Sequence, residues 1–521
     1  MKRKSLILSS ALVFLLMPAL AGCGSKKSSV GGTKSIVLWV GGESAAFYKS
    51  KVEQYLSANP DAGLKVDVVP SDIGSAGGAM DKDNTTCGDI VSIAHDNIGK
   101  LSQKSLIAPI VDDDLLEQIE TDNPEGFKEV IVNTLGNPEK NPEKYVFAAP
   151  YISQALFLYY DTRYVSDEQA ETFEGLEAAA RAHGEKTKSV LVTGTDGFNF
   201  SFSVLARKLL DGGKNEATSR IYEGFDRQAC YEQSNDQVAV MRWLQRSHES
   251  SNGILLKPGS SWEISIQEHN ALAAIGGAWQ YEAFKSAVGA ENIGCKPIPT
   301  FKLTDADVKG LTDVTYPNAD YIKPELRGKT DYAPKAGQEY RGGSFVDCKC
   351  FVINMAAVQK FDEPEEREDV YYKMTKLIKY LSSVEVQKES FVSALNVPAF
   401  VGADKYINEL PAGTVEASAI KMAQAQTAMA EYGIAQPFVD GRLNTFYYQN
   451  GGPDAYVQCI MNNDPDSFYQ SRSTEENPLS PEQEIRGIRR ALFKLEYIWR
   501  NGKKPNIDGI SANLPSASDK Q

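Results

Sequence analysis

The first hundred residues alternate between apolar patterns that are typical of strands and patterns that are typical of helices. Residues 36–40 form a continuous apolar run, which predicts a strand covered on both faces. Tyr48, Val52 and Tyr55 recur at helical spacing, and residues 64–68 alternate between apolar and polar positions as a second strand. This order predicts a β-α-β unit, and therefore a parallel sheet with covering helices.

A third apolar run extends this sheet and ends in polar residues. Ile90 to Ile93 is predicted to be a short buried strand, and His95, Asp96 and Asn97 follow it before a helix begins. Open α/β sheets bind their ligands outside the carboxyl ends of their strands. We therefore expect candidate ligand contacts in this turn, although a histidine beside a strand end is more typically buried and hydrogen-bonded.

Two long apolar stretches predict that the chain passes between two sheets. Residues 145–161 are too many for one strand, and we interpret them as two strands with a break near Ser153 and Gln154. Residues 344–354 form a second apolar crossing. A segment that leaves one sheet and enters another is a natural hinge, so we expect two lobes, each with its own core.

The second lobe repeats the pattern of strand, turn and helix. Residues 189–192 and 271–275 are predicted strands, and Val204, Leu205 and Leu209 are predicted to share a helix. The later strand ends in a Gly-Gly-Ala-Trp turn, where glycine lets the backbone turn tightly and lets a ligand approach.

Three further segments complete the expected order of elements. Residues 302–341 are polar and are interpreted as a long insertion without much core. Val370 to Leu381 carries the apolar stripe of a helix, and residues 382–387 indicate a helix cap and the start of the next helix. Residues 480–483 form a capping box ahead of a final helix, 485–498.

The N-terminus has the features of a lipoprotein leader. Residues 1–22 combine a basic start with an apolar run and form a signal peptide, and Cys23 stands where a bacterial lipobox carries its lipid. Residues 23–34 are then a lipid-anchored flexible tether, and two or more acyl chains would hold it stably on the membrane. The tail 504–521 is expected to be disordered.

Charge and cysteine content limit the classes of function. The formal net charge is -14, which argues against a nucleic-acid partner and against adsorption on anionic lipid. Only four histidines are present, and Cys348 and Cys350 are interpreted as small side chains on one face of a strand, so no metal and no cofactor are expected. The sequence leaves open which disulfides form among the six cysteines of the mature chain: Cys87, Cys230, Cys295, Cys348, Cys350 and Cys459.

An ordered set of motifs resembles the extracellular solute-binding proteins of bacterial ABC importers, in their maltose-binding-protein-like branch. The motifs are V-L-W-V-G-G-E, G-D-I-V-S-I-A-H-D-N-I-G, A-A-P-Y-I-S-Q-A-L-F-L-Y-Y-D, G-G-A-W, P-I-P-T-F and L-S-S-V-E-V-Q, over roughly residues 36–460. The resemblance implies an α/β chain with a two-lobed type II periplasmic-binding-protein fold, hinge strands and a central ligand cleft. We expect residues 35–153 plus 348–400 in the N-lobe and 154–347 plus 401–503 in the C-lobe.

The resemblance also implies ligand contacts in the first lobe. Glu43 and Asp96 stand where carboxylates of maltose-binding proteins bond sugar hydroxyls, and Asn97 replaces a basic residue of the pattern. Ser44 replaces a lysine, and Ile93 replaces a stacking tryptophan, so the same set of hydroxyls need not be recognised.

For the hinge and the second lobe, the resemblance implies an amide, an acid and several aromatic rings. Gln154 stands where the hinge segment has a ligand-contacting carboxylate, and Trp279 matches a stacking tryptophan. The other positions implied as ligand contacts are Asp196, Phe198, Phe446 and Tyr447.

Each of these residues also has a structural interpretation. Asp96 could cap the following helix, Glu43 could be a solvated loop acid, Gln154 could bond the backbone at the crossing, and Trp279 could anchor a core. Phe198 and Tyr447 could equally belong to a core, because aromatic residues at helical spacing are usually buried.

Three functions remain open from the sequence. The first is a monomeric binding protein that captures an extracellular sugar and delivers it to the permease subunits of an ABC importer. The second is a surface glycoside hydrolase, which would need two carboxylates at a defined separation, and no motif pairs two of them. The third is a binding protein for an anion, a polyamine or a peptide.

Overall fold

The fold is described by a computed structural model, which covers residues 32–194, 198–199, 201–210, 215–217, 235–256, 262–315, 318, 327–430, 433–435 and 485. The chain divides into two compact units: Met1–Ser153 with Cys348–Val401, and Gln154–Asp347 with Gly402–Gln521. We call them unit 1 and unit 2. Strand β7 (Ala149–Ala155) and strand β19 (Ser344–Asn354) each contain a boundary between the units. Among the helices of the described residues, none combines the length and the apolar character needed to cross a bilayer.

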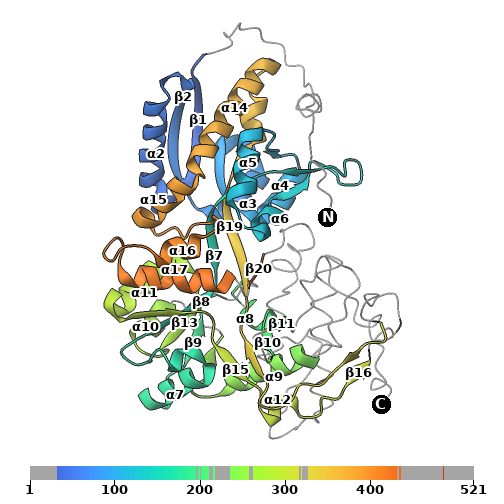
Figure 1. The fold of residues 1–521 in the computed structure, drawn as a ribbon, viewed down its shortest axis with the longest axis vertical. Coiled ribbons are helices and arrows are strands. Elements are labelled where there is room, and N and C mark those ends of the chain that lie inside the picture. The colour runs from blue at the N-terminus through green and yellow to red at the C-terminus, as the bar shows by residue number, and fades with distance from the viewer. Residues whose placement is uncertain are drawn as a thin grey trace. The chain divides into compact units, whose positions relative to one another are not determined.

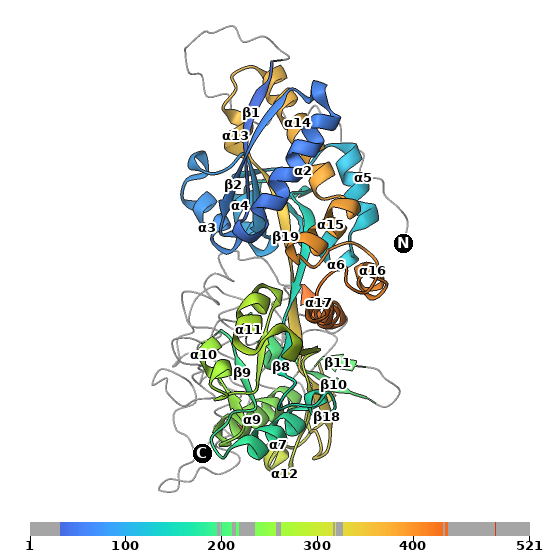
Figure 2. The same cartoon turned by 90° about the vertical axis from the view of Figure 1, so that its left-hand side faces the viewer.

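Unit 1 is built on a sheet with strand order β2-β1-β3-β19, and β4 and β7 also pair with β19. β1 runs parallel to β2 and to β3, whereas β19 runs antiparallel to β3. Helices lie on both faces of this sheet, with α3 and α4 on one face and α2 and α14 on the other (Figure 2). Besides β7 and β19, the elements of unit 1 are β1 (Lys34–Gly41), α2 (Ala45–Ala58), β2 (Leu64–Ser71), α3 (Ile73–Asp83), β3 (Ile90–Ala94), α4 (Ile98–Gln103), β4 (Ile107–Ala108), α5 (Asp113–Asp122), α6 (Glu125–Val130), β5 (Val132–Thr134), β6 (Lys144–Val146), α13 (Met355–Gln359), α14 (Pro364–Leu381) and α15 (Val384–Ala394).

Unit 2 is built on a sheet with strand order β12-β9-β13-β8-β14. Figure 1 labels three of these strands, β8, β9 and β13. β9 runs parallel to β12 and to β13, and β8 runs antiparallel to β13 and to β14. A second sheet has the order β11-β10-β18-β15. The described elements of unit 2 are β8 (Phe157–Asp161), α7 (Phe173–His183), β9 (Val190–Val192), α8 (Ser201–Val204), β10 (Arg207–Leu209), β11 (Asn215–Ala217), α9 (Asn235–Glu249), β12 (Ile254–Leu255), α10 (Trp262–Gln267), β13 (Ala273–Gly276), α11 (Tyr281–Val288), β14 (Ile293–Lys296), β15 (Thr300–Lys302), α12 (Asp305–Val308), β16 (Val314–Thr315), β17 (Thr330–Asp331), β18 (Glu339–Arg341), α16 (Ala403–Asn408), α17 (Ala417–Ala430) and β20 (Gly433–Ala435).

The predicted elements around the parallel strands are confirmed, with one refinement on β1. Tyr48, Val52 and Tyr55 are buried on α2, and β3 is buried along its whole length. On β1 only every second side chain is fully buried, so the prediction of two covered faces is wrong for this strand. Its neighbour β2 is half-exposed, which leaves the second face open to solvent at this side of the sheet.

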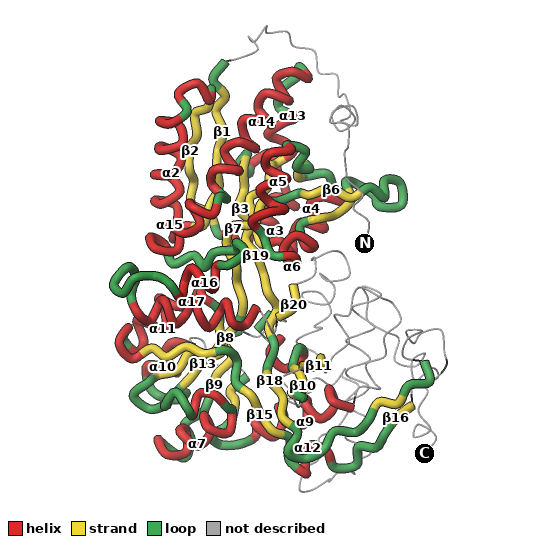
Figure 3. Tube along the Cα trace, in the orientation of Figure 1, coloured by secondary structure: helices red, strands yellow, loops and turns green. Residues whose placement is uncertain are grey.

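The first crossing differs in detail from its prediction. Ser153 and Gln154 lie inside β7, and the break comes at Leu156, between β7 and β8. The Leu156 backbone N–H donates to the Ser344 hydroxyl oxygen at 2.8 Å. A side chain of the second crossing therefore satisfies the backbone group at the point where strand pairing is interrupted. Figure 3 shows β19 itself as one continuous strand, with the bounds predicted for it.

Two predictions in unit 2 are wrong. The helix expected to include Leu209 ends at Val204, because Arg207–Leu209 pairs with β11 and β18 as strand β10. The insertion 302–341 also contributes to the core. Tyr340 is fully buried and stacks on Phe301 at 5.6 Å between ring centroids, and the Asp307 carboxylate accepts two hydrogen bonds from Arg246, at 3.0 and 2.8 Å.

The two helices predicted after β19 are confirmed by the buried stripe of the first and by the N-cap of the second. Val370, Met374, Leu377 and Leu381 are buried on α14. The Val386 backbone N–H donates to the Ser383 hydroxyl oxygen at 3.4 Å, as expected for an N-cap. The predicted final helix lies outside the described residues, except for the single helical position Ile485.

A buried ion pair fixes the start of β1 in unit 1. Lys34 Nζ lies 3.0 Å from Glu366 Oε1, and the two side chains are 8% and 6% exposed. Removing one partner of such a pair leaves a charge buried without compensation. We therefore expect Glu366→Gln to lower the free energy of unfolding by about 3–5 kcal/mol in urea titrations.

The matched control is Asp369→Asn on the same helix. Asp369 pairs with Lys373 at 2.8 Å, but these side chains are 27% and 15% exposed. Loss of this ion pair should lower the free energy of unfolding by less than about 1 kcal/mol, as for other solvated pairs. Equal effects of the two variants would contradict a special role for the Lys34–Glu366 pair.

Candidate functional site

In unit 1, the register of two parallel strands brings polar turns to one edge of the sheet. Leu38 of β1 pairs with Ile90 of β3, so the turn after β1 and the turn after β3 follow neighbouring strand ends. The first turn, Gly42–Ser44, carries Glu43, and the second, His95–Asn97, carries Asp96 and Asn97. We call Glu43, Asp96 and Asn97 the polar edge.

Asp96 and Asn97 support each other within the polar edge. Asp96 is 8% exposed, and the Asn97 side-chain amide donates to its Oδ1 at 2.8 Å. Asn97 is half-buried and lies against Gly77 of α3, where a Cβ atom would come within 2.4 Å of Asn97 Cγ. The glycine therefore provides the space that Asn97 occupies, and the amide is held in a fixed position beside the carboxylate.

Glu43 is exposed at the same edge and folds back over the chain. A Cβ atom at Gly41 would lie 2.4 Å from Glu43 Oε1, so this carboxylate covers the backbone of a glycine. Ser44, in contrast, is fully buried, and its hydroxyl donates to the Gly41 carbonyl oxygen at 3.4 Å. Ser44 is therefore a structural residue of the turn, whereas Glu43 is open to solvent.

Buried aromatic side chains of β7 and β19 pack beside β3, the strand that leads to Asp96. Tyr151 of β7 stacks on Phe351 of β19 at 4.1 Å, and its hydroxyl lies 2.5 Å from the Ser92 hydroxyl. Burial, with smaller contributions from the Tyr48 hydroxyl and the Glu43 carboxylate, raises the pKa of Tyr151 well above its ordinary value. This tyrosine therefore stays neutral and is a buried packing residue near Glu43.

His95 has the structural role expected for a histidine beside a strand end. It is fully buried, and its Nδ1 accepts a hydrogen bond from the Cys348 backbone N–H at 3.2 Å. Ile93, which stands in place of a stacking tryptophan in the resemblance, is a fully buried residue of β3. Neither residue offers a surface to a ligand in unit 1.

In unit 2, a second pair of parallel strands brings a glycine turn and a polar loop together. Ile275 of β13 pairs with Val192 of β9, and the Thr193 backbone N–H donates to the Ile275 carbonyl oxygen at 3.2 Å. Gln280 Oε1 accepts hydrogen bonds from the Gly277 backbone N–H and from the Thr193 hydroxyl, both at 3.0 Å. Gln280 therefore ties the turn after β13 to the loop after β9.

Trp279 projects from this tied turn. Its side chain is 48% exposed, which is unusual for a tryptophan. A Cβ atom at Gly277 would come within 2.0 Å of the six-membered ring of the indole, so the ring lies directly on the glycine backbone. Because Gly277 has no side chain, part of the six-membered ring rests on the protein while the residue as a whole stays half-exposed.

Two phenylalanines complete an aromatic corner around Trp279. The Phe198 ring lies 5.7 Å from the Trp279 ring at 58°, and 6.2 Å from the Phe345 ring at 29°. Phe198 is half-buried and Phe345 is fully buried. The Phe345 backbone N–H donates to the Ser201 hydroxyl oxygen at 3.2 Å, so β19 holds the innermost ring in place. We call Phe198, Trp279 and Phe345 the aromatic corner.

The structure brings together only part of the predicted set. Gln154 is half-buried on β7, and its side chain has no hydrogen-bond partner among the residues that the structure describes. Asp196, Phe446, Tyr447 and Cys23 lie outside the described residues. Sequence reasoning missed Phe345, Thr193 and Gln280. Only Gln280 had a local signal, the Gly-x-x-Gln spacing of a capped turn.

Metal binding finds no support within the described residues. In that part of the chain, no group of three or more histidine, cysteine, aspartate or glutamate side chains gathers as a metal ion would require. Cys348 and Cys350 are fully buried with their Sγ atoms 3.5 Å apart, on one face of β19, as predicted for this strand.

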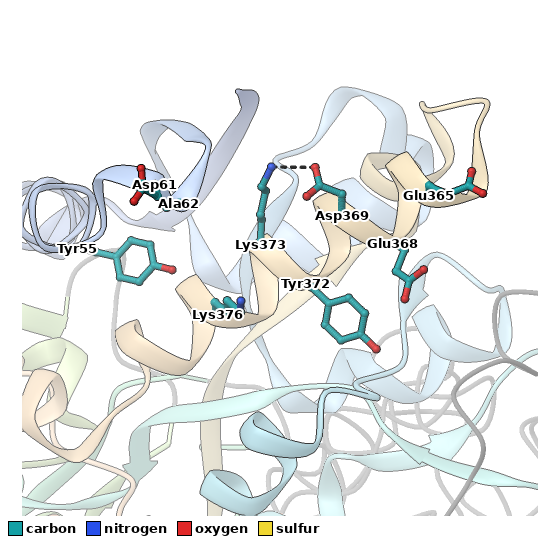
Figure 4. A pocket seen from close by; sticks show the side chains of 9 residues that line it. All are labelled: Tyr55, Asp61, Ala62, Glu365, Glu368, Asp369, Tyr372, Lys373 and Lys376. Carbon is teal, nitrogen blue, oxygen red and sulfur yellow. Dashed lines mark hydrogen bonds and ion pairs between the residues drawn. The ribbon is translucent and has the colours of Figure 1, made fainter. Parts of the chain in front are cut away.

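A separate pocket of about 400 Å³ lies between α2 and α14 in unit 1. Figure 4 shows it with the Lys373–Asp369 ion pair on α14. Its lining residues are Tyr55, Asp61, Ala62, Glu365, Glu368, Asp369, Tyr372, Lys373 and Lys376. None of them belongs to the polar edge, so this pocket is not the candidate site.

Comparison with known proteins identifies the class. A sequence profile described as "Bacterial extracellular solute-binding protein" matches residues 52–400, and the chain belongs to this family. The members of this class are extracytoplasmic binding proteins rather than enzymes. No curated protein matches the chain in sequence.

Solved structures with the same fold are distant in sequence. A maltodextrin-binding protein from L. casei BL23 without ligand has a TM-score of 0.57 and 19% identity, over 88% of this chain and 99% of that chain. The GacH receptor of Streptomyces glaucescens has a TM-score of 0.57 and 13% identity, over 90% and 99%. An extracellular solute-binding protein from Staphylococcus aureus in complex with maltose has a TM-score of 0.53 and 14% identity, over 94% and 100%. The predicted α/β fold of the maltose-binding-protein type, with two lobes, is confirmed.

The contact between Gly277 and Trp279 gives a test of the aromatic corner. Gly277→Ala would place a methyl group where the indole lies, so we expect the ring to be displaced at a cost of roughly 1–3 kcal/mol. The displacement can be followed by fluorine NMR of protein labelled with 5-fluorotryptophan, in which Trp279→Phe assigns the Trp279 resonance.

Gly42→Ala is the matched control for this variant. A Cβ atom at Gly42 meets no other atom within 4 Å, so all resonances should stay in place. An unchanged Trp279 resonance in Gly277→Ala would show that the indole does not rest on this glycine.

Proposed function

We propose that this protein captures a sugar or oligosaccharide outside the cell and delivers it to the permease subunits of an ABC importer. The observation that carries the proposal is the half-exposed Trp279, which is supported by Gly277 and flanked by Phe198. The related structures support the same class of ligand, since they are described with maltodextrin, maltose and acarbose.

The aromatic corner suits the apolar faces of a sugar ring. A pyranose has C–H groups on its faces, and an aromatic ring covers them with a large contact area at a small cost in conformational entropy. Trp279 and Phe198 meet at 58°, so the two rings form an angled wall rather than one flat platform. Such a wall favours a ligand with successive rings over a small polar solute.

The polar edge suits the hydroxyl rim of the same ligand. A carboxylate accepts several hydroxyl protons, and hydrogen bonds to an ionised acceptor are stronger than neutral ones. The amide of Asn97 already donates to Asp96 Oδ1 and fixes its orientation. Glu43 is exposed and adds a second acceptor at the same strand edge.

We assign one face of the ligand to each unit. Unit 1 would supply acceptors through Glu43, Asp96 and Asn97, and unit 2 would supply rings through Phe198 and Trp279. Gln154, Asp196, Phe446 and Tyr447 stay in the proposed contact set. A ligand that touches both units stabilises the closed arrangement of a hinged protein, with β7 and β19 as the hinge strands of a cleft between the lobes.

The departures from the maltose-binding pattern indicate that the ligand is held by a different set of contacts. Ile93 is buried in the core of unit 1 and offers no stacking surface, and Ser44 is buried in its turn. Unit 1 therefore lacks the ring and the lysine that the pattern has at these positions. We therefore propose that the sugar rings stack mainly on aromatic side chains of unit 2.

We further propose that the mature protein is a monomer held at the outer face of the cell membrane by lipid on Cys23. The support is the sequence of residues 1–23, where a basic start and an apolar run lead to Leu-Ala-Gly-Cys. Residues 24–33 would then act as a tether with a reach of about 15–20 Å, and the folded chain begins at Lys34, which is buried at the start of β1.

Ligand binding is tested by calorimetry with maltodextrins and unrelated oligosaccharides. We expect micromolar binding of at least one glycan, and Trp279→Ala should weaken it by about 30-fold or more, as for the loss of ~2 kcal/mol from a buried aromatic anchor. Trp262→Phe, on α10 outside the aromatic corner, should leave the affinity within about threefold.

Two results would overturn the proposal. Release of new reducing ends during the titration would favour a hydrolase, because a binding protein returns its ligand unchanged. Binding of an anion, a polyamine or a peptide but of no glycan would favour another class of solute.

Lipid attachment is tested by phase partitioning in Triton X-114 after expression of the full chain in bacteria. The wild-type protein should enter the detergent phase, and Cys23→Ala should move it to the aqueous phase, because the acylated thiol is lost. Equal partitioning of the two proteins would exclude an anchor at this residue.

A further inference from the structure

Strand β19 carries two thiols at the point where the chain passes from one unit to the other. Cys348 follows directly on the boundary after Asp347, and Cys350 lies two residues further along the strand. Their Sγ atoms are 3.5 Å apart, and both residues are fully buried. Both cysteines are thiols in this structure.

The neighbours of this thiol pair connect it to the polar edge. The Cys348 backbone N–H donates to His95 Nδ1, and His95 is followed by Asp96 in the same turn. Lys349 pairs with Ala94, and Cys350 pairs with Ile93, in the antiparallel register of β19 and β3. A change in the path of β19 at this position would therefore move the turn that holds Asp96.

We propose that Cys348 and Cys350 form a reversible disulfide, and that this bond controls the position of the polar edge. The family to which the chain belongs works outside the cytoplasm, where thiol pairs are commonly oxidised. The two sulfurs already touch, and the intervening residue Lys349 leaves both thiols on one face of the strand.

The chemistry is a thiol–disulfide exchange with a small disulfide or the disulfide of an extracytoplasmic oxidoreductase. One cysteine thiolate attacks a sulfur of the oxidant, and a mixed disulfide forms as one thiol leaves. The second cysteine thiolate then attacks the mixed disulfide, the Cys348–Cys350 bond forms, and the second thiol leaves. Overall, two protein thiols are oxidised by two electrons and one disulfide is reduced to two thiols.

The geometry indicates a labile bond rather than a permanent one. Residues two apart in an extended strand have Cα atoms about 6.6 Å apart, near the upper end of the range that a disulfide can span. Bond formation must therefore shorten β19 locally, and strained disulfides are the ones that are readily reduced. Burial also raises the pKa of the Cys348 thiol well above its ordinary value, so exchange requires local opening or occurs before β19 packs.

Shortening of β19 would affect two contacts. It would pull the Cys348 N–H away from His95 Nδ1, and it would disturb the pairing of Lys349 with Ala94. The oxidised protein should therefore bind its ligand more weakly than the reduced protein. This second part rests on the proposed function, whereas the formation of the bond does not.

The bond is tested by peptide mapping of the wild-type protein. The protein is refolded from denaturant with glutathione disulfide, free thiols are blocked with N-ethylmaleimide, and trypsin then cleaves after Lys349. We expect peptides 342–349 and 350–360 to remain joined and to separate after reduction. Cys87 and Cys295, which are free thiols, should be alkylated or carry glutathione and should not join peptides.

Cys348→Ser and Cys350→Ser are the matched controls, since either one removes a partner and should abolish the joined peptide. Separate alkylated peptides 342–349 and 350–360 from the refolded wild type would overturn the proposal. The proposed function would be untouched by that result, because it does not depend on these thiols.

The control of binding is tested on the same samples with the glycan found by calorimetry. We expect the oxidised wild type to bind about tenfold more weakly than the same protein after dithiothreitol, and Cys348→Ser to show no dependence on redox state. A joined peptide with unchanged affinity would overturn the control of the polar edge. Absence of glycan binding in both redox states would count against the proposed function instead.

Discussion

The structure depends on the hydrogen-bonded register between neighbouring parallel strands. In unit 1, Asp89 fixes this register twice, because its backbone N–H donates to the Val37 carbonyl oxygen at 2.7 Å and its carboxylate accepts from the Val37 N–H at 2.7 Å. In unit 2, the pairing of Val192 with Ile275 has the same effect. A shift of one residue in either pair would turn the strand side chains to the opposite face and separate the turns that carry the candidate site.

The two units use this constraint to present different chemistry. Unit 1 places carboxylates and an amide at the ends of β1 and β3, whereas unit 2 places rings beside the end of β13. In both units a glycine creates the space, with Gly77 accommodating Asn97 and Gly277 supporting Trp279. Because Asn97 and Trp279 are each packed closely against a glycine, these two side chains should lose little conformational freedom when a ligand binds.

Much of the fold could be predicted from the sequence because its strands are short apolar runs bounded by turns. Strand β19 has the predicted bounds. Ten of its eleven residues are buried, so its sequence is a nearly continuous apolar run that is typical of a strand covered on both faces. The break after β7 could not be placed, because it depends on the Ser344 hydroxyl, which is distant in sequence. Likewise, Leu209 follows a helical spacing but pairs in a sheet, because tertiary pairing outweighed a weak local pattern.

The sequence indicates which residues belong to the candidate site but not how exposed their side chains are. The motifs identified Asp96 and Trp279, yet only the packing on Gly277 shows that the indole is half-exposed rather than buried. Phe345 had no signal of its own, since an aromatic residue in an apolar strand is normally a core residue. Its role follows from stacking on Phe198, which lies 345 − 198 = 147 positions earlier in the sequence.

The central proposal is that a glycan binds to the polar edge of unit 1 and to the aromatic corner of unit 2. Hydrogen–deuterium exchange measured along a glycan titration tests it most directly. Amides of residues 41–44 and 95–98 in unit 1 and of residues 193–194 and 276–280 in unit 2 should become protected with the same dependence on glycan concentration. Protection in one unit alone, or in neither, would contradict the account.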